Sequence, residues 1–515
     1  MMNLDTVEKV EVVKGGGAVL YGSEAYGGVI NVITKDSYKN SVHVATGNKG
    51  QRDYSATIGA GKLGLSFGRN EMGETGIISQ KIGSKKFDGS NSQEYYTGFG
   101  DSRKDHIDIS YKFDDKLQLN YMFNKKKYTT NYLSGNEEIL QHFMYDDREH
   151  FAQLHFNDQS GLDATAYYNE RAIRNPDYST ADPSILEWER SKHKNYGADV
   201  KKVWENKDDK ILIGFNTKRE LYVDENQKFV YNTLNLKPFA SFGTYALNGY
   251  SLYGQYDRKL SDATNVIFSM REDMVRSDAG DYNAFLPQLQ AITKLDEQNS
   301  LYANIGRSFR MPTFRQLYYS SGMIASNPDL KPEYGWNYEA GYKHDNGKEQ
   351  FKAAVFHIDL DDQIASRKVN GLSQSYNASK YKNTGVEVSY TKAFNDNLSW
   401  TVGGIYSNPQ NKTTDSDPWK DVLGKYQVMT SVDYQHDKTS ASLNLSYMGG
   451  RVNNSSQDDI KPILLSNVHV GYEVWKNATL TLDVNNIFNR RDLTDPDNKY
   501  YTQGRTFLVG MNYSF

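Results

Sequence analysis

The dominant feature of the chain is an alternation of apolar and polar residues that recurs over most of its length. In residues 107–113, isoleucine and aromatic side chains alternate with aspartate, serine and lysine. A period of two places the apolar side chains on one face of a β-strand and the polar ones on the other. The same pattern is clear in 117–123, 442–447, 468–474 and 479–484. The sequence therefore predicts an all-β protein whose strands each have one apolar face.

The predicted strands are about 9 to 12 residues long, which is longer than a typical globular strand and suits a tilted strand that crosses a bilayer. Tight connections rich in Asp, Asn and Gly, such as Asp114-Asp115 and Asn395-Asp396-Asn397, take turns with long ones. The long connections are expected at 71–104, 128–147, 174–191, 222–243 and 309–335. Short turns at one rim and long loops at the other are typical of an outer-membrane barrel.

Composition removes several other classes of protein. With a mean hydropathy of -0.73 and no apolar run of about 18 residues, the sequence excludes a helical membrane protein. A net charge of -4 argues against a nucleic-acid partner, because phosphate binding needs a basic surface. The absence of cysteine excludes a disulfide scaffold or a Cys-ligated metal centre.

The number of strands follows from the rhythm of short and long connections. Residues 351–360 and 361–368 resemble two strands, but the rhythm holds only if they form one long strand. The count is then 22, and the start of the first strand and the end of the last strand both lie at the rim with the short turns. The fold class is thus a transmembrane antiparallel β-barrel. We expect Val468, Val470, Leu480 and Leu482 to face lipid, and finding them in a dry core would exclude this fold.

The first 35 residues differ from the rest of the chain. A short strand at 7–14 is followed by glycines, by Leu-Tyr-Gly-Ser at 20–23, and by an apolar run at 27–35. This stretch resembles the end of the plug domain of TonB-dependent outer-membrane receptors, with Lys9 and Lys14 in place of the family's Arg and Gly16 in place of its Pro. The residues that carry this plug motif are Gly15, Tyr21, Gly22, Ser23, Gly27, Gly28 and Asn31.

Two further segments resemble the same family. Residues 308–313 and 327–333 are similar to its Phe-Arg-Ala-Pro and Asn-Pro-Asn-Leu boxes, with Met311 and Asp329 as departures. In our strand count these boxes lie between strands 13 and 14, where the family carries them. The closing segment, with an aromatic as last residue, also resembles the family's final strands. The resemblance thus covers the whole chain.

The resemblance implies a division into two parts and a set of partners. Residues 1–40 would be the C-terminal remnant of a plug domain, and residues 41–515 the barrel with its long extracellular loops. The implied protein is a monomeric transporter in the outer membrane of a diderm bacterium, energised by TonB. The signal peptide, the segment that TonB grips and most of the plug are not found in the sequence, so we expect either a fragment of a longer product or a separately encoded plug. An unplugged barrel would instead be a passive, porin-like channel.

For the substrate, the resemblance implies a scarce nutrient complex, and we expect an iron complex, siderophore or haem, with cobalamin as the alternative. The candidate ligand contacts are loop residues with aromatic, basic, imidazole or box-motif character: Phe309, Arg310, Pro312, Tyr318, Tyr319, Asn327, Pro328, Leu330, Tyr132, His142, Tyr145 and His150. The histidines could be haem ligands or solvated loop residues, and Asp146-Asp147 could hold calcium or simply line a loop.

Sequence patterns that resemble enzyme motifs have simpler structural interpretations in this chain. Gly59-Ala60-Gly61-Lys62-Leu63-Gly64 matches a dinucleotide-binding pattern, but the strand that follows it indicates a hairpin turn. No nucleophile triad or carboxylate pair stands out, so we predict no catalysis and no cofactor. A soluble β-propeller or sandwich would also alternate, but the 40- to 50-residue repeat of a propeller is not found.

Overall fold

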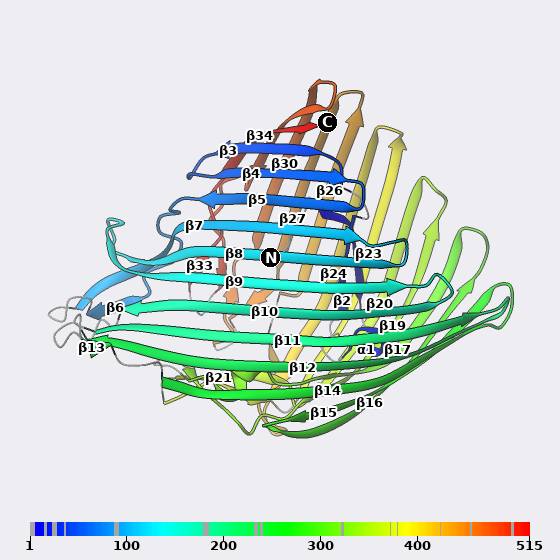
Figure 1. Ribbon diagram of the computed structural model, residues 1–515, viewed down its shortest axis with the longest axis horizontal. Coiled ribbons are helices and arrows are strands. Elements are labelled where there is room, and N and C mark those ends of the chain that lie inside the picture. Colours follow the sequence, from blue (N-terminus) through cyan, green and yellow to red (C-terminus); the bar gives the residue numbers. More distant parts are fainter. Residues whose placement is uncertain are drawn as a thin grey trace.

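The computed structural model shows a single large β-barrel with a small N-terminal segment inside it (Figure 1). It describes all residues except 1–5, 15–17, 23–27, 36–37, 87–91, 179–184, 231–234, 237–239, 321–323, 371, 379, 423, 454–455 and 496–498. Among the described residues, no helix has the length and apolar character needed to cross a membrane.

The barrel wall is a closed antiparallel sheet. Within the described residues it has 22 long strands, which confirms the predicted number, and pairing of the first with the last closes the ring. These strands are β3 (Ser41–Gly47), β4 (Arg52–Ala60), β5 (Leu63–Met72), β7 (Ser92–Lys112), β8 (Leu117–Leu133), β9 (Ile139–Asn157), β10 (Leu162–Tyr178), β11 (Ile185–Glu205), β12 (Asp209–Val230), β14 (Ala240–Lys259), β15 (Thr264–Ser277), β16 (Gly280–Lys294), β17 (Asn299–Arg310), β19 (Glu333–Asp345), β20 (Glu349–Asp361), β23 (Lys380–Asn395), β24 (Leu398–Lys412), β26 (Tyr426–His436), β27 (Thr439–Gly449), β30 (Ile463–Trp475), β31 (Ala478–Asn485) and β34 (Thr506–Ser514). Closure leaves no exposed sheet edge, as a lipid environment requires.

Short strands and two helices supplement the wall. Three short strands pair with the ends of wall strands, and the others form small sheets of their own. The remaining elements are β1 (Val7–Lys14), α1 (Ala18–Tyr21), β2 (Gly28–Thr34), β6 (Gly83–Lys86), β13 (Asn235–Leu236), α2 (Phe314–Tyr318), β18 (Ile324–Ala325), β21 (Ile364–Val369), β22 (Leu372–Asn377), β25 (Lys420–Asp421), β28 (Arg451–Val452), β29 (Asp459–Ile460), β32 (Leu493–Asp495) and β33 (Tyr500–Tyr501).

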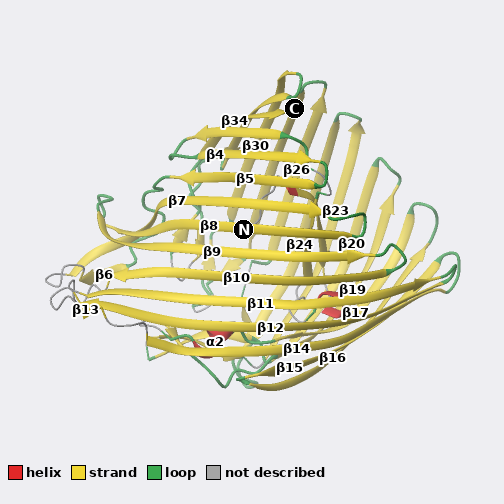
Figure 2. Ribbon diagram, in the orientation of Figure 1, coloured by secondary structure: helices red, strands yellow, loops and turns green. Residues whose placement is uncertain are grey.

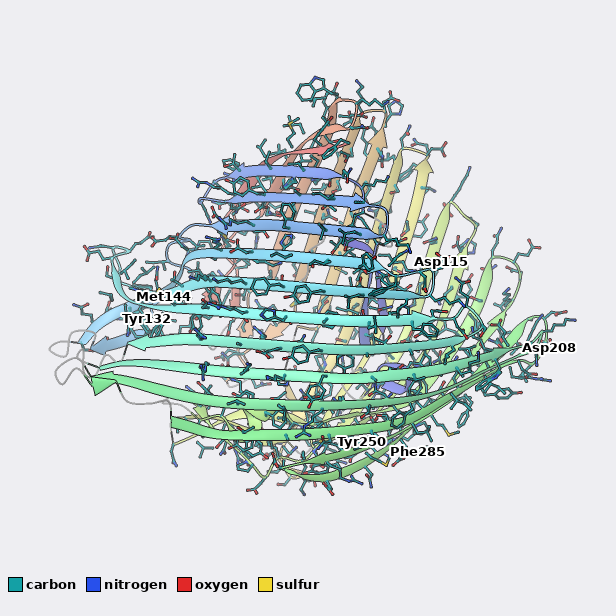
Figure 3. All side chains as sticks on the ribbon, in the orientation of Figure 1. Asp115, Tyr132, Met144, Asp208, Tyr250 and Phe285 are labelled. Carbon is teal, nitrogen blue, oxygen red and sulfur yellow. The ribbon has the colours of Figure 1, made fainter. Side chains whose placement is uncertain are left out.

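The two ends of the barrel differ as the sequence predicts. Asp115 and Asp208 lie in tight turns at one end, whereas Tyr132 and Met144 lie at the other, where the long connections are (Figure 3). In these turns Asp and Asn side chains accept hydrogen bonds from backbone amides two or three residues ahead, as Asp114 does from Lys116 and Leu117. The predicted Gly59–Gly64 hairpin is also present, with Gly61 at a φ of 60°.

The register shows which face meets lipid. Val470 and Leu482 are paired across β30 and β31, Val468 lies on the same face, and Leu480 continues it. Val470, Leu480 and Leu482 remain 36%, 46% and 38% exposed. The residues between them are polar, and they include His469, whose Nδ1 lies 2.7 Å from Asp483 Oδ1. The apolar residues therefore face outward and the polar ones face the lumen, as expected for a transmembrane barrel.

Two sequence predictions about strand extent are wrong. Residues 351–368 do not form one strand, because β20 ends at Asp361 and Asp362 takes a φ of 56°. The following β21 pairs with β22 and belongs to a separate three-stranded sheet with β18. The count of 22 still holds, because neither β21 nor β22 is part of the wall.

The second error concerns the predicted loops at 128–147, 174–191 and 222–243. Strands β8 to β12 are 17 to 22 residues long and continue through much of these ranges. A membrane crossing needs only about 9 to 11 residues, so these strands extend beyond the bilayer as paired hairpins. The polar composition that suggests a loop belongs to strand ends surrounded by water.

The N-terminal segment lies inside the barrel. Strands β1 and β2 form an antiparallel pair, and α1 between them contacts β14, β15, β16 and β17. Figure 2 shows α1 and α2 as the two helices within an otherwise β structure. The wall that α1 touches is also the wall beneath the loop that carries α2.

Candidate functional site

The N-terminal segment contacts the lumen wall at a buried charged network on β15. The Arg271 guanidinium donates to Asp273 Oδ1 at 2.6 Å and to Ser251 Oγ at 2.7 Å. Both charged side chains are only 6% exposed. Arg271 Nη1 also donates to the Val19 carbonyl oxygen of α1 at 3.4 Å, a long hydrogen bond. The short hydrogen bonds of Arg271 thus lie within the wall, and the one that reaches α1 is long.

Residues of the plug motif surround this contact. Gly22 is buried after α1 with a φ of 94°, and a Cβ there would lie 3.5 Å from Arg271 Nη2. Its backbone conformation, more than crowding, therefore favours glycine. Gly28 begins β2, also at positive φ, and Asn31 Nδ2 donates to Glu11 Oε2 at 3.1 Å, which ties β2 to β1. The other motif positions Gly15, Ser23, Gly27 and the Tyr21 side chain lie outside the described residues.

An aromatic cluster joins loop 311–332 to the same wall. Tyr245 and Tyr318 stack with ring centroids 3.6 Å apart, and Tyr222 stacks on Phe314 at 6.0 Å. Val29 of β2 packs against this cluster. Helix α2 is held by a capping box between Thr313 and Gln316, which explains how so short a helix forms. The loop therefore folds inward, toward the N-terminal segment.

Most of the predicted box residues build this loop. Phe309 and Leu330 are 1% exposed and Pro312 is buried, so none of the three presents a surface to a ligand in this structure. Arg310 makes a bidentate ion pair with Glu333 at 2.6 and 2.7 Å.

The remaining box residues are more accessible. Asn327 Nδ2 donates to the Ser375 carbonyl oxygen at 2.9 Å and ties the loop to β22. Tyr319 lies under the Arg315 guanidinium at 4.4 Å, and Pro328 is exposed. Tyr319 and Pro328 are therefore the box-region candidates with accessible side chains.

A second group of predicted residues lies at the rim on β8 and β9. Tyr128 pairs with Tyr145, and their rings stack at 4.6 Å. The ring centroid of Tyr132 lies 5.0 Å from that of Tyr95 and 5.3 Å from that of Phe143. The alternation along β8 places Tyr128 and Tyr132 on the face of Asn120 and Gln118, which is the lumen face. We call Tyr95, Tyr128, Tyr132, Phe143 and Tyr145 the aromatic strip.

The predicted histidines are not part of this strip. His142 and His150 stand at even positions of β9, whereas Tyr145 stands at an odd one, so both imidazoles point to the outside of the barrel. His150 contacts the Tyr121 hydroxyl at 2.9 Å on that outer face. In this register neither histidine faces a ligand held in the lumen.

Tyrosines of the strip and of loop 311–332 share one chemical property. Burial, with the nearby Asp147 carboxylate, raises the pKa of Tyr128, and burial with Asp278 raises the pKa of Tyr318. These phenols therefore stay protonated at neutral pH and suit stacking or hydrogen-bond donation better than ligation of iron as phenolates. Lys126 lies 4.5 Å over the Tyr128 ring and adds a positive charge.

The aspartate pair does not form a calcium site. Asp146 binds Arg148 on the outer face, whereas Asp147 binds Arg171, so the two carboxylates diverge. Within the part of the chain that the structure describes, no three His, Asp or Glu side chains cluster as metal ligands would.

Sequence reasoning missed the Arg271 network and the wall side of the aromatic cluster. A signal exists in residues 269–275, where Ser269, Arg271 and Asp273 alternate with outward Met270 and Met274. Arginine and aspartate facing one lumen could have been recognised as a polar docking point. Their contact with residues 19 and 22 could not, because it joins segments about 250 positions apart.

A closed barrel of this size, with an apolar exterior, a polar lumen and an internal N-terminal segment, defines an outer-membrane transporter. The family described as TonB dependent receptor-like, beta-barrel matches residues 35–487, and the chain belongs to this family. It is therefore a TonB-coupled outer-membrane transporter of a Gram-negative bacterium, in a family of transporters and not of enzymes.

Known relatives differ in what they carry. The vitamin B12 transporter BtuB of Vibrio vulnificus (strain CMCP6) is 24% identical over 548 residues, covering 99% of this chain and 80% of the relative. Among solved structures, the copper transporter OprC has a TM-score of 0.76 at 16% identity, covering 99% of this chain and 86% of its own. The ferric enterobactin receptor PfeA of Pseudomonas aeruginosa has a TM-score of 0.74 at 19% identity, covering 100% and 86%. At these identities the structural likeness shows the fold alone.

Proposed function

We propose that this transporter imports an iron complex, either a siderophore or haem, that first binds at the loop end of the lumen. The observation that carries the proposal is the aromatic strip on the lumen face of β8 and β9, with Lys126 beside it. Flat aromatic chelators and porphyrins stack on such rings, and the anionic charge that many iron complexes carry favours a nearby cation.

The residues proposed to contact the ligand are those with accessible side chains. They include Tyr132 and Tyr145 of the strip, with Tyr319 and Pro328 on loop 311–332. Phe309, Arg310, Pro312 and Leu330 would act indirectly, by holding that loop in place. The solved relatives named for ferric enterobactin and for iron support this substrate class.

A corrinoid is the second candidate. The sequence relatives named for vitamin B12 favour it, and a flat corrin ring would also stack on the strip. A corrinoid would depend on the rings but much less on the charge of Lys126. This difference separates the two candidates.

We also propose that residues 1–40 are the movable part of the lumen and residues 41–515 its fixed wall. The long hydrogen bond from Arg271 to Val19, beside the shorter ones from Arg271 to Asp273 and Ser251, supports this division. Displacement of α1 would break this hydrogen bond and expose Val19, which is 1% exposed in the structure. A permanently open, porin-like channel is the alternative outcome.

The test measures binding of three probes to the purified full chain in detergent. The probes are a ferric catecholate, haem and cyanocobalamin, and binding is detected as quenching of the protein's intrinsic fluorescence. Replacing Tyr128 and Tyr145 by alanine should weaken binding of the true substrate class about tenfold or more, since each aromatic contact contributes about 0.5 to 1.5 kcal/mol. The matched control is alanine at Tyr406 and Tyr426, a ring pair at 5.4 Å on the outer face, which should have no effect.

Lys126→Gln then separates the candidates. We expect weaker binding of the anionic iron complex and unchanged binding of cobalamin. Tight binding of cobalamin, with no binding of the other two probes, would show that the substrate is a corrinoid and not an iron complex. Failure of all three probes to bind at micromolar concentration would refute both substrates.

A further inference from the structure

The outer face of β8 to β11 carries a concentration of basic side chains just beyond the last tyrosines. Pairing across these strands places Tyr121, Tyr168 and Tyr196 in one row. The rows nearer the loop end hold Lys125, Arg148 and Lys192, and then Lys127, Arg174 and Arg190. The basic patch consists of Lys125, Lys127, Arg148, Arg174, Arg190, Lys192 and Lys194.

A pocket of 290 Å³ lies at the centre of this patch. It is lined by Arg148, His150, Glu170, Ala172, Arg174, Arg190, Lys192 and Val223. Ala172 is the small residue that creates the hollow, because its row neighbours on β9 and β11 are Arg148 and Lys192. The pocket is therefore a concave site with cations on both sides.

Among the side chains that the structure describes, this surface carries fewer acidic residues than basic ones. Glu170 binds Lys192 at 2.6 Å and Lys194 at 3.5 Å, and Asp146 binds Arg148 at 2.9 Å. Glu225 of β12 pairs with Arg190, so these rows hold seven basic residues against three acidic ones, in a chain whose net charge is -4. Such a local excess of positive charge facing outward has no role in binding a ligand on the lumen side.

The height of the patch relates it to the membrane surface. Trp204, at the turn end of β11, and Tyr196 both face outward and are eight residues apart. At about 3.3 Å per residue and a tilt of about 40°, they are separated by about 20 Å along the membrane normal, close to the height of an apolar band with aromatic girdles. Lys194, Lys192 and Arg190 follow Tyr196 toward the loop end. The basic patch thus lies at the headgroup level of the outer leaflet.

We propose that the pocket at Ala172 binds a phosphate group on the headgroup of an outer-leaflet lipid. Arginine guanidinium groups match phosphate oxygens in a bidentate manner, and basic pockets at the headgroup level of membrane proteins suit anionic lipids. The tyrosine row below would contact the upper part of the acyl chains. The bound lipid would hold the long hairpins of β8 to β11 upright, and with them the aromatic strip on their opposite face.

The experiment measures lipid binding to the purified full chain by native mass spectrometry in a neutral detergent. The probes are a bis-phosphorylated lipid A disaccharide, the same lipid after removal of its phosphates, and inorganic phosphate. We expect binding of the phosphorylated lipid, at least tenfold weaker binding of the dephosphorylated one, and no displacement by millimolar inorganic phosphate.

Two variants test the location. Arg174→Gln combined with Arg190→Gln should weaken binding of the phosphorylated lipid about thirtyfold, since each basic residue near a lipid surface contributes about 1 kcal/mol. The matched control is Lys116→Gln with Lys207→Gln, the same loss of charge in exposed turns at the opposite end of the barrel, and it should bind normally. Ala172→Phe fills the hollow without a change of charge and should also weaken binding.

Folding is checked by the heat-modifiable migration of the barrel on gels, and Arg174→Lys with Arg190→Lys should retain most of the binding. Equal binding by the phosphorylated and dephosphorylated lipids, or an equal loss in the turn control, would overturn the proposal. Displacement by inorganic phosphate at low concentration would assign the pocket to a free anion and refute a lipid. None of these outcomes depends on which substrate the lumen carries.

Discussion

The assignment of the two faces can be tested by placing one arginine on each side of the same strand. Leu443 lies in the middle of β27, pairs with Val432 and Val468, and is 37% exposed on the outer face. Asn444 is its immediate neighbour and faces the lumen, where its amide donates to Ser442 Oγ at 3.4 Å.

The expected costs differ strongly. An arginine on the lipid face near the bilayer midplane destabilises a barrel by about 2 to 4 kcal/mol. At Asn444 the guanidinium stays in water among polar neighbours, and the change should remain within about 0.5 kcal/mol. Leu443→Arg should therefore be about 3 kcal/mol less stable than Asn444→Arg, which is roughly a hundredfold in the folding equilibrium.

The assay is reversible guanidinium unfolding of the full chain in phospholipid vesicles, followed by tryptophan fluorescence. A third variant, Tyr447→Arg, adds a depth control, because Tyr447 is outward but near the loop end of β27. It should cost only about 0 to 1 kcal/mol. Equal losses at Leu443 and Asn444, or no dependence on depth, would refute the assignment of faces.

Three further outcomes are expected. Gly22→Ala strains a backbone at a φ of 94° by about 1 to 2 kcal/mol, so proteolysis of the N-terminal segment in the folded barrel should become about tenfold faster, and an unchanged rate would contradict its docking at this position. Arg310→Ala leaves the Glu333 carboxylate, 3% exposed, without its bidentate partner at a cost of about 3 kcal/mol, and amide exchange in loop 311–332 should rise roughly hundredfold. The Ser160 hydroxyl and backbone amides lower the pKa of Asp158 from 3.8 to about 2, so the stability that this turn gains is present above pH 4 and lost as the pH falls toward 2. Ser160→Ala should make thermal stability less dependent on pH in that range. An identical pH profile would contradict the view that the Ser160 hydroxyl lowers the pKa of Asp158.

Much of the barrel was determined by local sequence. Alternation at period two identifies strands and their faces because the pleat itself imposes that period, and Asp, Asn and Gly mark the tight turns because the turn geometry requires them. The 22 strands, the alternating turns and loops and the outward faces of Val470 and Leu482 all follow from such short-range rules. The box residues were located correctly between strands 13 and 14, and their contact with a ligand stays a prediction.

The tertiary structure alone decided where strands end and which side chains meet. Polar residues at 128–147 suggest a loop, yet pairing with neighbouring strands continues them as a hairpin, because backbone hydrogen bonds to an adjacent strand outweigh a weak local propensity. The break at Asp362 likewise depends on β21 finding β22 as a partner. His150 and Tyr145 are close in sequence but face opposite sides, and only the strand that contains both makes this visible. The contact of Arg271 with Val19 joins distant parts of the chain, and no local pattern specifies it, since it exists only once the barrel has closed around the N-terminal segment.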